Sequence, residues 1–184
     1  MIEFETDRLL IRDARASDAD DFYQYMRLET YWRDVPIEAP TVEFVTSLVN
    51  RCIENQSENP RTDYFLAAVD KGSEELVGEA ILHVRSIRWR QGEIGWGVSA
   101  SRTGHGLATE IGRAMLRYGF DILGVHRVFA QCRVENLASR RIMAKLGMRE
   151  EGVLRENVLA RGEWWSSAQS SILSTEWSGT TKVA

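Results

Sequence analysis

The segment at residues 102–109 is the part of this chain whose residue types and spacing best suit chemistry. It reads Arg-Thr-Gly-His-Gly-Leu-Ala-Thr and lies between a predicted strand and a long predicted helix. Glycines at the alternate positions Gly104 and Gly106 let the backbone turn tightly and bring bare N–H groups close to a ligand. The first turn of the helix adds unpaired N–H donors, which favour a bound anion. On the two glycines alone, a turn that only connects two elements would be the better interpretation.

Two specific phosphate-binding motifs are absent from the chain. No run matches the G-x-x-x-x-G-K-[ST] pattern of P-loop nucleotide triphosphate enzymes. The dinucleotide pattern G-x-G-x-x-G would need glycine at position 109, where the chain has Thr109, and it usually lies nearer the start of a chain. A nicotinamide-dependent oxidoreductase is therefore the weakest of the enzymatic interpretations.

The residues that could bind metal or form disulfides show no matching pattern. His83, His105 and His126 are dispersed in sequence, and none lies in an H-E-x-x-H spacing, so no metal site is expected. Cys52 and Cys132 lie far apart and without C-x-x-C spacing. Two such cysteines indicate a reducing compartment rather than a disulfide framework.

The elements that must position the glycine turn follow from hydrophobic periodicity. Apolar residues spaced i, i+3, i+4 predict helices, and short apolar runs bounded by turn residues predict strands. Predicted helices cover 17–26, 41–53, 106–123 and 136–146, and predicted strands cover 6–12, 64–69, 76–84, 93–98, 127–133, 149–157 and 167–173. Strands on both sides of helices, with several hairpins, indicate a mixed-sheet α/β or α+β domain.

Length and composition indicate one globular domain. The chain has 184 residues, of which 43% are hydrophobic, and 23 basic against 27 acidic side chains give a net charge of −4. This balance argues against a direct nucleic-acid partner, which usually needs a basic face. No apolar run approaches the length of a membrane span, and the first residues are charged rather than signal-like. We therefore expect a cytoplasmic protein without a membrane partner, and a homodimer is left open.

The predicted strand and the turn after it form one continuous motif. Glu-Ile-Gly-Trp-Gly-Val at 93–98, followed by Thr-Gly-His-Gly-Leu-Ala-Thr-Glu at 103–110, resembles the acetyl-CoA motif of the GNAT superfamily of N-acetyltransferases. The run at 133–148 is similar to that family's second cofactor segment. The opening residues 5–12 and Arg-Gly-Glu-Trp at 161–164 resemble the Rim-type branch, the ribosomal-protein-alanine N-acetyltransferases. Four motifs in the right order are hard to obtain by chance.

The resemblance implies the acyl-CoA N-acyltransferase fold of that superfamily. Its expected form is a single mixed, mostly antiparallel central sheet of about six to seven strands, flanked by about four helices. The domain is expected to cover residues 1–175, and residues 176–184 are expected to form a flexible tail.

Acetyl-CoA is the cofactor that the resemblance implies, with a role for each segment. The bare amides of the turn would bind the diphosphate, and the strand before it would donate an N–H to the thioester carbonyl. Asn136 would hold the pantetheine arm, and its position also suits the N-cap of the next helix. The implied cofactor-binding residues are Gly97, Val98, Thr103, Gly104, His105, Gly106, Leu107, Ala108, Thr109 and Asn136.

Acyl transfer requires that the acceptor amine be neutral. At pH 7, deprotonating a lysine side chain costs about 4.6 kcal/mol, whereas an α-amino group costs only about 1.1 kcal/mol. A protein N-terminus can therefore react with the help of a modest base acting through water. The resemblance implies Glu93 as that base, although an ordinary solvated charge explains Glu93 equally well. It also implies that the Ser139 hydroxyl donates to the thiolate sulfur.

Three tryptophans are the candidates for the acceptor groove, because loops carry specificity. Trp32 lies in an irregular early segment, and Trp164 and Trp165 form an adjacent pair. Ser166 stands where members of the Rim-type branch commonly have Asp, which bears on the acceptor. We expect transfer of acetyl from acetyl-CoA to a protein or peptide N-terminal α-amino group. The alternatives are acetylation of a small amine (an antibiotic, polyamine or amino-acid derivative) and a CoA-binding regulatory module without turnover.

Overall fold

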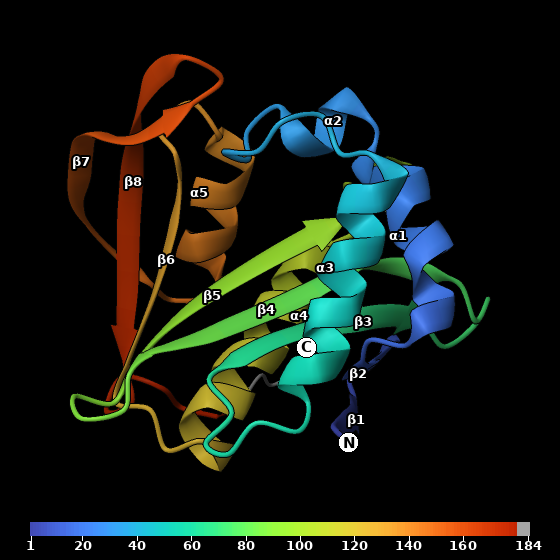
Figure 1. Cartoon of the computed structure of the whole chain (residues 1–184). Coiled ribbons are helices and arrows are strands. Elements are labelled where there is room, and N and C mark those ends of the chain that lie inside the picture. The colour runs from blue at the N-terminus through green and yellow to red at the C-terminus, as the bar shows by residue number, and fades with distance from the viewer. Residues whose placement is uncertain (180–184) are drawn as a thin grey trace.

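A computed structural model describes residues 1–179 and shows one eight-stranded sheet with helices on both faces (Figure 1). The strands are β1 (Glu3–Glu5), β2 (Leu9–Asp13), β3 (Asp63–Asp70), β4 (Leu76–Ser86), β5 (Gln91–Val98), β6 (Arg127–Arg133), β7 (Arg149–Ala160) and β8 (Glu163–Leu173). Their order in the sheet is β1-β2-β3-β4-β5-β6-β8-β7, and only β5 and β6 are parallel. The mixed, mostly antiparallel sheet is confirmed. The strand beyond those predicted is β1, whose three residues are too few to show a period.

Five α-helices flank the sheet within the described residues, one more than predicted. They are α1 (Ala19–Met26), α2 (Glu29–Trp32), α3 (Val42–Asn55), α4 (Leu107–Arg117) and α5 (Leu137–Lys145). The additional helix is α2, a single turn in a segment that we expected to be irregular. After α4, the chain continues through a π-helical turn at Tyr118–Ile122. None of these helices is both long and apolar enough to cross a membrane.

The helix α1 begins later than predicted, because Asp18 rather than Ser17 organises its start. A short 3-10 turn at Ala16–Asp18 precedes the helix. The Asp18 carboxylate accepts two hydrogen bonds from the buried Arg12 guanidinium, at 2.7 and 2.8 Å, and a third from the backbone N–H of Arg15 at 2.7 Å. A buried bidentate ion pair of this kind joins the start of α1 to β2.

Two apolar cores lie on opposite faces of the sheet. The larger core packs α4 and α5 against the central strands and includes Ile111, Met115, Leu116, Leu82 and Val128. The smaller core packs α1 and α3 against β3 and includes Phe22, Val45, Val49 and Ala67. Because side chains alternate along a strand, β3 contributes to both cores, with Leu66 and Ala68 in the larger and Ala67 and Val69 in the smaller. Figure 1 shows α1 and α3 together on the near face of the sheet.

The end of the described chain lies against the larger core. The Trp177 ring packs on the Phe120 ring with centroids 5.8 Å apart, and Trp177 belongs to the partly buried rim of that core. The first residues of the expected tail are therefore packed. Residues 180–184, the remainder of that expected tail, lie outside the described residues.

The strands β5 and β6 pair over only three rungs and then diverge. The paired residues are Gln91 with Arg127, Gly92 with Val128 and Glu93 with Phe129. Beyond Glu93, β5 pairs with β4 alone and β6 pairs with β8 alone, so the two parallel strands fan apart in Figure 1. Their facing backbone groups are left free of sheet hydrogen bonds. This divergence positions the candidate site.

Candidate active site

The glycine turn joins the diverging end of β5 to α4. Gly104 and Gly106 have φ values of 82° and 80°, in the left-handed region that glycine adopts without strain. Gly106 is the N-cap of α4 and provides no side-chain cap, so the first amides of the helix lack an internal acceptor. A Cβ added at Gly104 would meet no atom within 4 Å, so the turn is open to a ligand. A diphosphate suits this arrangement of donors.

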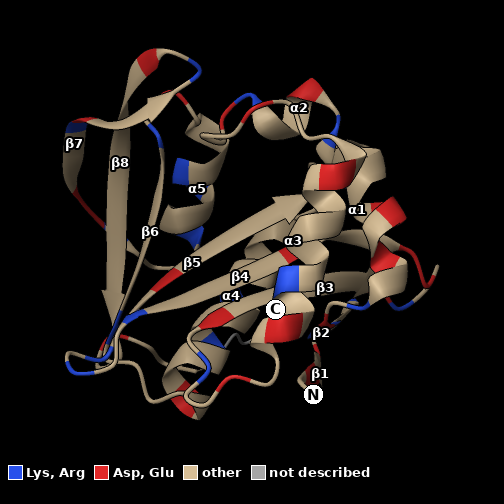
Figure 2. Ribbon diagram, in the orientation of Figure 1, with Lys and Arg blue, Asp and Glu red and all other residues tan. Residues whose placement is uncertain are grey.

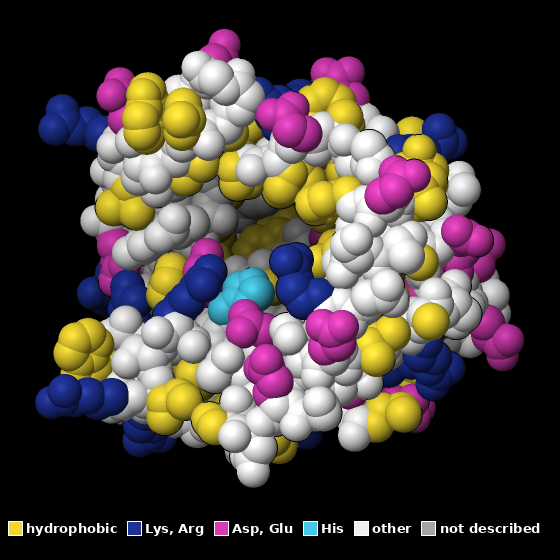
Figure 3. All heavy atoms as spheres, viewed as in Figure 1, with side chains coloured by type: hydrophobic (Ala, Val, Ile, Leu, Met, Phe, Trp, Pro, Cys, Tyr) yellow, Lys and Arg dark blue, Asp and Glu magenta, His cyan; other side chains and the backbone are white. Residues whose placement is uncertain are grey.

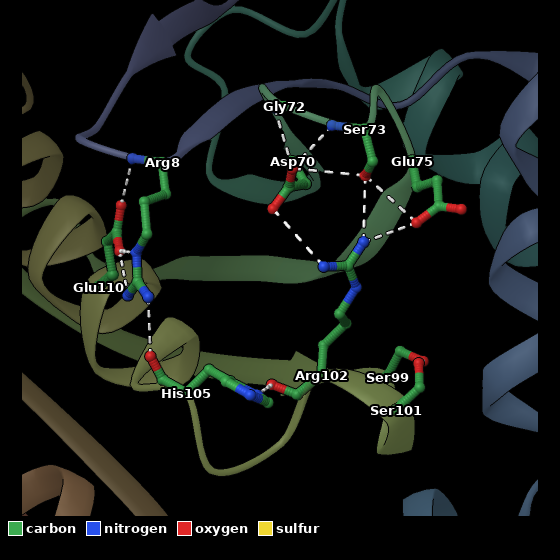
Figure 4. Close-up of polar contacts among 10 residues, drawn as sticks. All are labelled: Arg8, Asp70, Gly72, Ser73, Glu75, Ser99, Ser101, Arg102, His105 and Glu110. Atoms are coloured by element: carbon green, nitrogen blue, oxygen red, sulfur yellow. Dashed lines mark hydrogen bonds and ion pairs between the residues drawn. The ribbon is translucent and has the colours of Figure 1, made fainter.

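The turn is held on one side by Arg8 and Glu110 (Figure 4). The Arg8 guanidinium donates to the backbone oxygen of His105 at 2.8 Å and to the Glu110 carboxylate at 2.7 Å. Thr6 also donates to Glu110, at 2.6 Å. Burial alone would raise the pKa of Glu110, but the hydrogen bonds from Thr6 and Arg8 outweigh it and lower that pKa. The carboxylate thus stays charged and ties α4 to the start of β2.

Arg102 holds the other side of the turn instead of facing a ligand (Figure 4). Its guanidinium donates to Glu75 at 2.7 Å and to Ser73 at 3.1 Å, both in the β3–β4 hairpin. The His105 side chain is exposed, with Nδ1 3.4 Å from the backbone oxygen of Arg102. Neither side chain adds a cation to the open face, so the backbone amides supply the donors there.

A cleft of about 580 Å³ lies where β5 and β6 diverge. It is bounded by the two strands, the start of α5, strand β8 and the segment after α2. Figure 3 shows the hollow from outside, with charged side chains of both signs and a histidine along one rim. Of the residues predicted from the sequence, the cleft is lined by Glu93, Gly97, Val98, Asn136, Ser139 and Trp165. The turn residues 103–109 lie beyond the end of this cleft, after Val98.

Asn136 is the N-cap of α5, as its position predicted. Its side-chain oxygen accepts a hydrogen bond from the backbone N–H of Ser139 at 3.0 Å, so both residues are held together at the cleft. Cys132 also lines the cleft, and its thiol donates to the Asn136 backbone oxygen over 3.8 Å. Burial raises the pKa of Cys132 to about 11, so this sulfur remains a thiol near neutral pH.

The three tryptophans predicted for the acceptor groove differ from one another in where they lie relative to the cleft. Trp165 is buried at the cleft wall, with the guanidinium groups of Arg133 and Arg161 4.3 and 4.4 Å from its ring centroid. Trp164 points to the opposite face of β8 and is 61% exposed, because neighbouring residues alternate along a strand. Trp32 lies outside the cleft lining and also contacts Arg161, at 5.3 Å from its ring centroid.

Arg161 is a residue whose role sequence reasoning missed. It occupies the two-residue turn of the β7–β8 hairpin with Gly162, and φ values of 50° and 76° match the turn type that suits such hairpins. Its guanidinium donates to four backbone oxygens after and within α2, those of Trp32, Arg33, Val35 and Ile37, at 2.6 to 3.3 Å. The hairpin thereby fixes the segment that forms one wall of the cleft. The Arg-Gly-Glu-Trp motif at 161–164 was the sequence feature from which a role for Arg161 could have been inferred.

Glu79 is a second residue that sequence reasoning missed. It lies on β4 opposite Gly97 of β5, lines the cleft and is only 2% exposed. Tyr25 and Tyr31 donate their hydroxyls to its carboxylate, the latter at 2.9 Å. A Cβ added at Gly97 would lie 2.0 Å from a carboxyl oxygen, so glycine is needed there. Burial raises the pKa of Glu79 to about 7. An acidic residue inside a predicted buried strand was the signal for it.

Glu93 lies on the same face of the sheet, four residues before Gly97. Its carboxylate accepts a hydrogen bond from Arg85 Nε at 2.7 Å. Directly opposite Glu93 in the β4–β5 register is His83, which also lines the cleft. His83 Nδ1 is 2.5 Å from a carboxylate oxygen of Asp63, its partner on β3. Figure 2 shows acidic and basic residues meeting near this end of the central strands.

Comparison with known proteins places the chain in a family. A family model described as "Acetyltransferase (GNAT) domain" matches residues 8–149. An uncharacterised N-acetyltransferase of Bacillus subtilis, YnaD, is 30% identical over 172 residues, which cover 94% of this chain and 97% of that protein.

Solved structures agree with this family. A GNAT-family acetyltransferase from Bacillus anthracis has a TM-score of 0.84 and 28% identity, with 95% of this chain and all of the other covered. RimJ of Mycobacterium smegmatis, solved in complex with CoA-disulfide, has a TM-score of 0.80 and 26% identity, with 92% and 84% covered. The chain belongs to the GNAT family of N-acetyltransferases, which use acetyl-CoA.

Proposed function

We propose that this acetyltransferase acts on the α-amino group of a protein or peptide N-terminus. The observation that carries the proposal is the set of proton acceptors on the cleft wall. They are one histidine and two carboxyl groups, His83, Glu79 and Glu93. At pH 7, an α-amino group loses its proton at a cost of about 1 kcal/mol, whereas a lysine side chain costs about 4.6 kcal/mol, so side chains of these types suit the α-amino group as acceptor.

The shape of the cleft supports an acceptor that enters beside the contact between α2 and the β7–β8 hairpin. Trp165 and the segment fixed by Arg161 form the walls of that entrance, and Asp34 adds an acidic group beside it. Acidic side chains attract an ammonium group before it loses its proton. We therefore retain Trp165 as a proposed acceptor-binding residue, whereas Trp32 lies outside the cleft lining and Trp164 on the opposite face of β8.

The coenzyme is proposed to occupy the turn and the gap between β5 and β6. The amides of residues 103–109 would bind the diphosphate, and the free backbone of Gly97 and Val98 would meet the pantetheine and thioester. Asn136 would hold the arm, and Ser139 would donate to the departing sulfur. Their position at the start of α5, on the cleft, supports both roles.

One relative is named for a protein acceptor, which supports a protein acceptor here. The [ribosomal protein uS5]-alanine N-acetyltransferase of Escherichia coli is 23% identical over 124 residues, which cover 67% of this chain and 64% of that enzyme. A small amine is the second candidate, because a cleft of about 580 Å³ falls in the range of small-molecule sites.

The test is release of free CoA thiol with a matched acceptor panel. Each peptide is supplied with a free and with a blocked α-amino group, beside spermidine and amino-acid amides. We expect turnover of the free peptides and none of the blocked ones, with mass spectrometry placing the acetyl group on the N-terminal nitrogen. Turnover confined to the small amines would refute a peptide acceptor and favour the second candidate.

A further inference from the structure

His83 and Asp63 form a dyad on the cleft face of the sheet. His83 Nδ1 lies 2.5 Å from an Asp63 oxygen, and the other Asp63 oxygen accepts a hydrogen bond from Thr62 at 3.0 Å. Burial acts to raise the pKa of Asp63, but the hydrogen bonds from His83 and Thr62 lower it overall. Asp63 is therefore ionised at neutral pH and can only accept hydrogen bonds.

This pairing decides the tautomer of the imidazole. Since the Asp63 carboxylate has no proton to donate, Nδ1 of His83 must be the N–H donor. In the neutral ring, the lone pair then lies on Nε2, which becomes the proton acceptor. A carboxylate that orients a histidine in this way is the arrangement that prepares imidazole for general-base catalysis.

The position of His83 in the sheet places its ring on the cleft wall. In the β4 strand, His83 shares a face with Glu79 and Ile81, and in β5 its neighbours on that face are Glu93 and Gly95. All of them line the cleft, and the His83 side chain is one-third exposed. Glu93 is the last rung at which β5 and β6 are paired, so His83 stands where the gap opens.

We propose that His83, oriented by Asp63, is the catalytic base that removes the proton from the acceptor amine, and that Glu93 supports it electrostatically. Nε2 takes one N–H proton as the nitrogen lone pair forms the C–N bond with the thioester carbon. The C–S bond breaks and its electron pair leaves on sulfur, whose charge a hydrogen bond from the Ser139 hydroxyl would stabilise. The imidazolium then returns its proton to the thiolate. No further reactant is consumed, and the step holds for either class of acceptor.

The charges around the ring suit this step. Asp63 faces the ring from β3 and Glu93 from β5, so the imidazolium would lie between two carboxylates. Arg85 engages one Glu93 oxygen at 2.7 Å and limits the net negative charge. Asp63 is a positioning residue, because it acts through His83.

The kinetic test compares H83A with H126A, a matched variant of an exposed histidine that immediately precedes β6 and does not line the cleft. We expect H83A to lose on the order of 10²-fold in kcat with the best acceptor of the panel. Added imidazole should restore part of the rate in H83A, and H126A should behave as wild type. The acid limb of the kcat profile, which does not report the free acceptor amine, should disappear in H83A and remain in E79Q and E93Q. A limb that disappears in E93Q instead, or H83A with unchanged kcat, would refute the proposal.

A spectroscopic test needs neither substrate nor activity. Nitrogen-15 NMR of the free protein should show the His83 ring protonated at Nδ1, and D63N should redistribute the proton toward Nε2. The D63N variant should also lower kcat with little change in the affinity for acetyl-CoA measured by calorimetry. A ring protonated at Nε2 in the wild type would overturn the dyad, whatever the acceptor panel shows.

Discussion

Glu79 couples the protonation of one carboxyl group to folding. Among the described residues its partners are the hydroxyls of Tyr25 and Tyr31, and no cation is paired with it. Burial and the nearby carboxylate raise the pKa values of both tyrosines well above their usual range, so both hydroxyls remain donors. The hydrogen bonds only partly offset the burial of the carboxylate, whose pKa is raised from 4.5 to about 7. The folded state therefore favours the neutral acid.

The consequence is a pH-dependent stability that one substitution should remove. Below about pH 4.5, the Glu79 carboxyl group is protonated in both the folded and the unfolded state, and the stabilising effect of its raised pKa is complete. This stabilisation is lost as the pH rises through about 7. In Glu79→Gln, the free energy of unfolding relative to wild type should rise by up to about 3 kcal/mol between pH 4.5 and pH 8. Urea denaturation at both pH values measures it. An equal difference at both values would show that Glu79 does not titrate on folding.

At the scale of elements, the cleft depends on contacts between segments distant in sequence. The β7–β8 hairpin reaches across to the segment after α2, more than 120 residues earlier in the chain. A guanidinium is suited to this because its planar fork can serve several carbonyl oxygens at once. The cleft wall is thus an inter-element contact rather than a property of either segment.

Substituting Arg161 should therefore affect the acceptor more than the coenzyme. In Arg161→Ala, we expect KM for the acceptor to rise about tenfold while the affinity for acetyl-CoA changes less than twofold, because the Arg161 guanidinium bonds to the end of α2 and the segment after it and not to the glycine turn. Arg161→Lys should leave KM for the acceptor nearly as high as in Arg161→Ala, since an ammonium group cannot reproduce the planar, forked guanidinium. Arg155→Ala, an exposed arginine on β7, is the matched control. A loss of coenzyme affinity instead would show that the hairpin supports the whole site.

At the scale of the molecule, the proposed coenzyme site joins elements from both halves of the chain. The turn is held by Arg8 and Glu110, and Arg102 reaches the β3–β4 hairpin. Binding at such a site stabilises the folded state by mass action, because the unfolded chain has no site.

Acetyl-CoA should accordingly raise the melting temperature. At a concentration one hundred times the Kd, the gain is about 2.7 kcal/mol, which for a protein of this size corresponds to roughly 5–10 °C. Scanning fluorimetry measures the shift, with NAD as the control ligand, which should leave the melting temperature unchanged. A shift produced by NAD and not by acetyl-CoA would contradict the coenzyme assignment.

Features that depend on local order could be predicted from the residues alone. The alternate glycines of the turn, the N-cap at Asn136 and the periods of the strands and of α3 and α4 are patterns of neighbouring residues, and so is the motif order that indicates the GNAT family. Three features became visible only in the fold: the point where β5 and β6 separate, the tryptophan that faces the cleft, and the row that Asp63, His83 and Glu93 share across three strands. Strand register and burial arise from contacts between residues far apart in the chain, which no local pattern encodes.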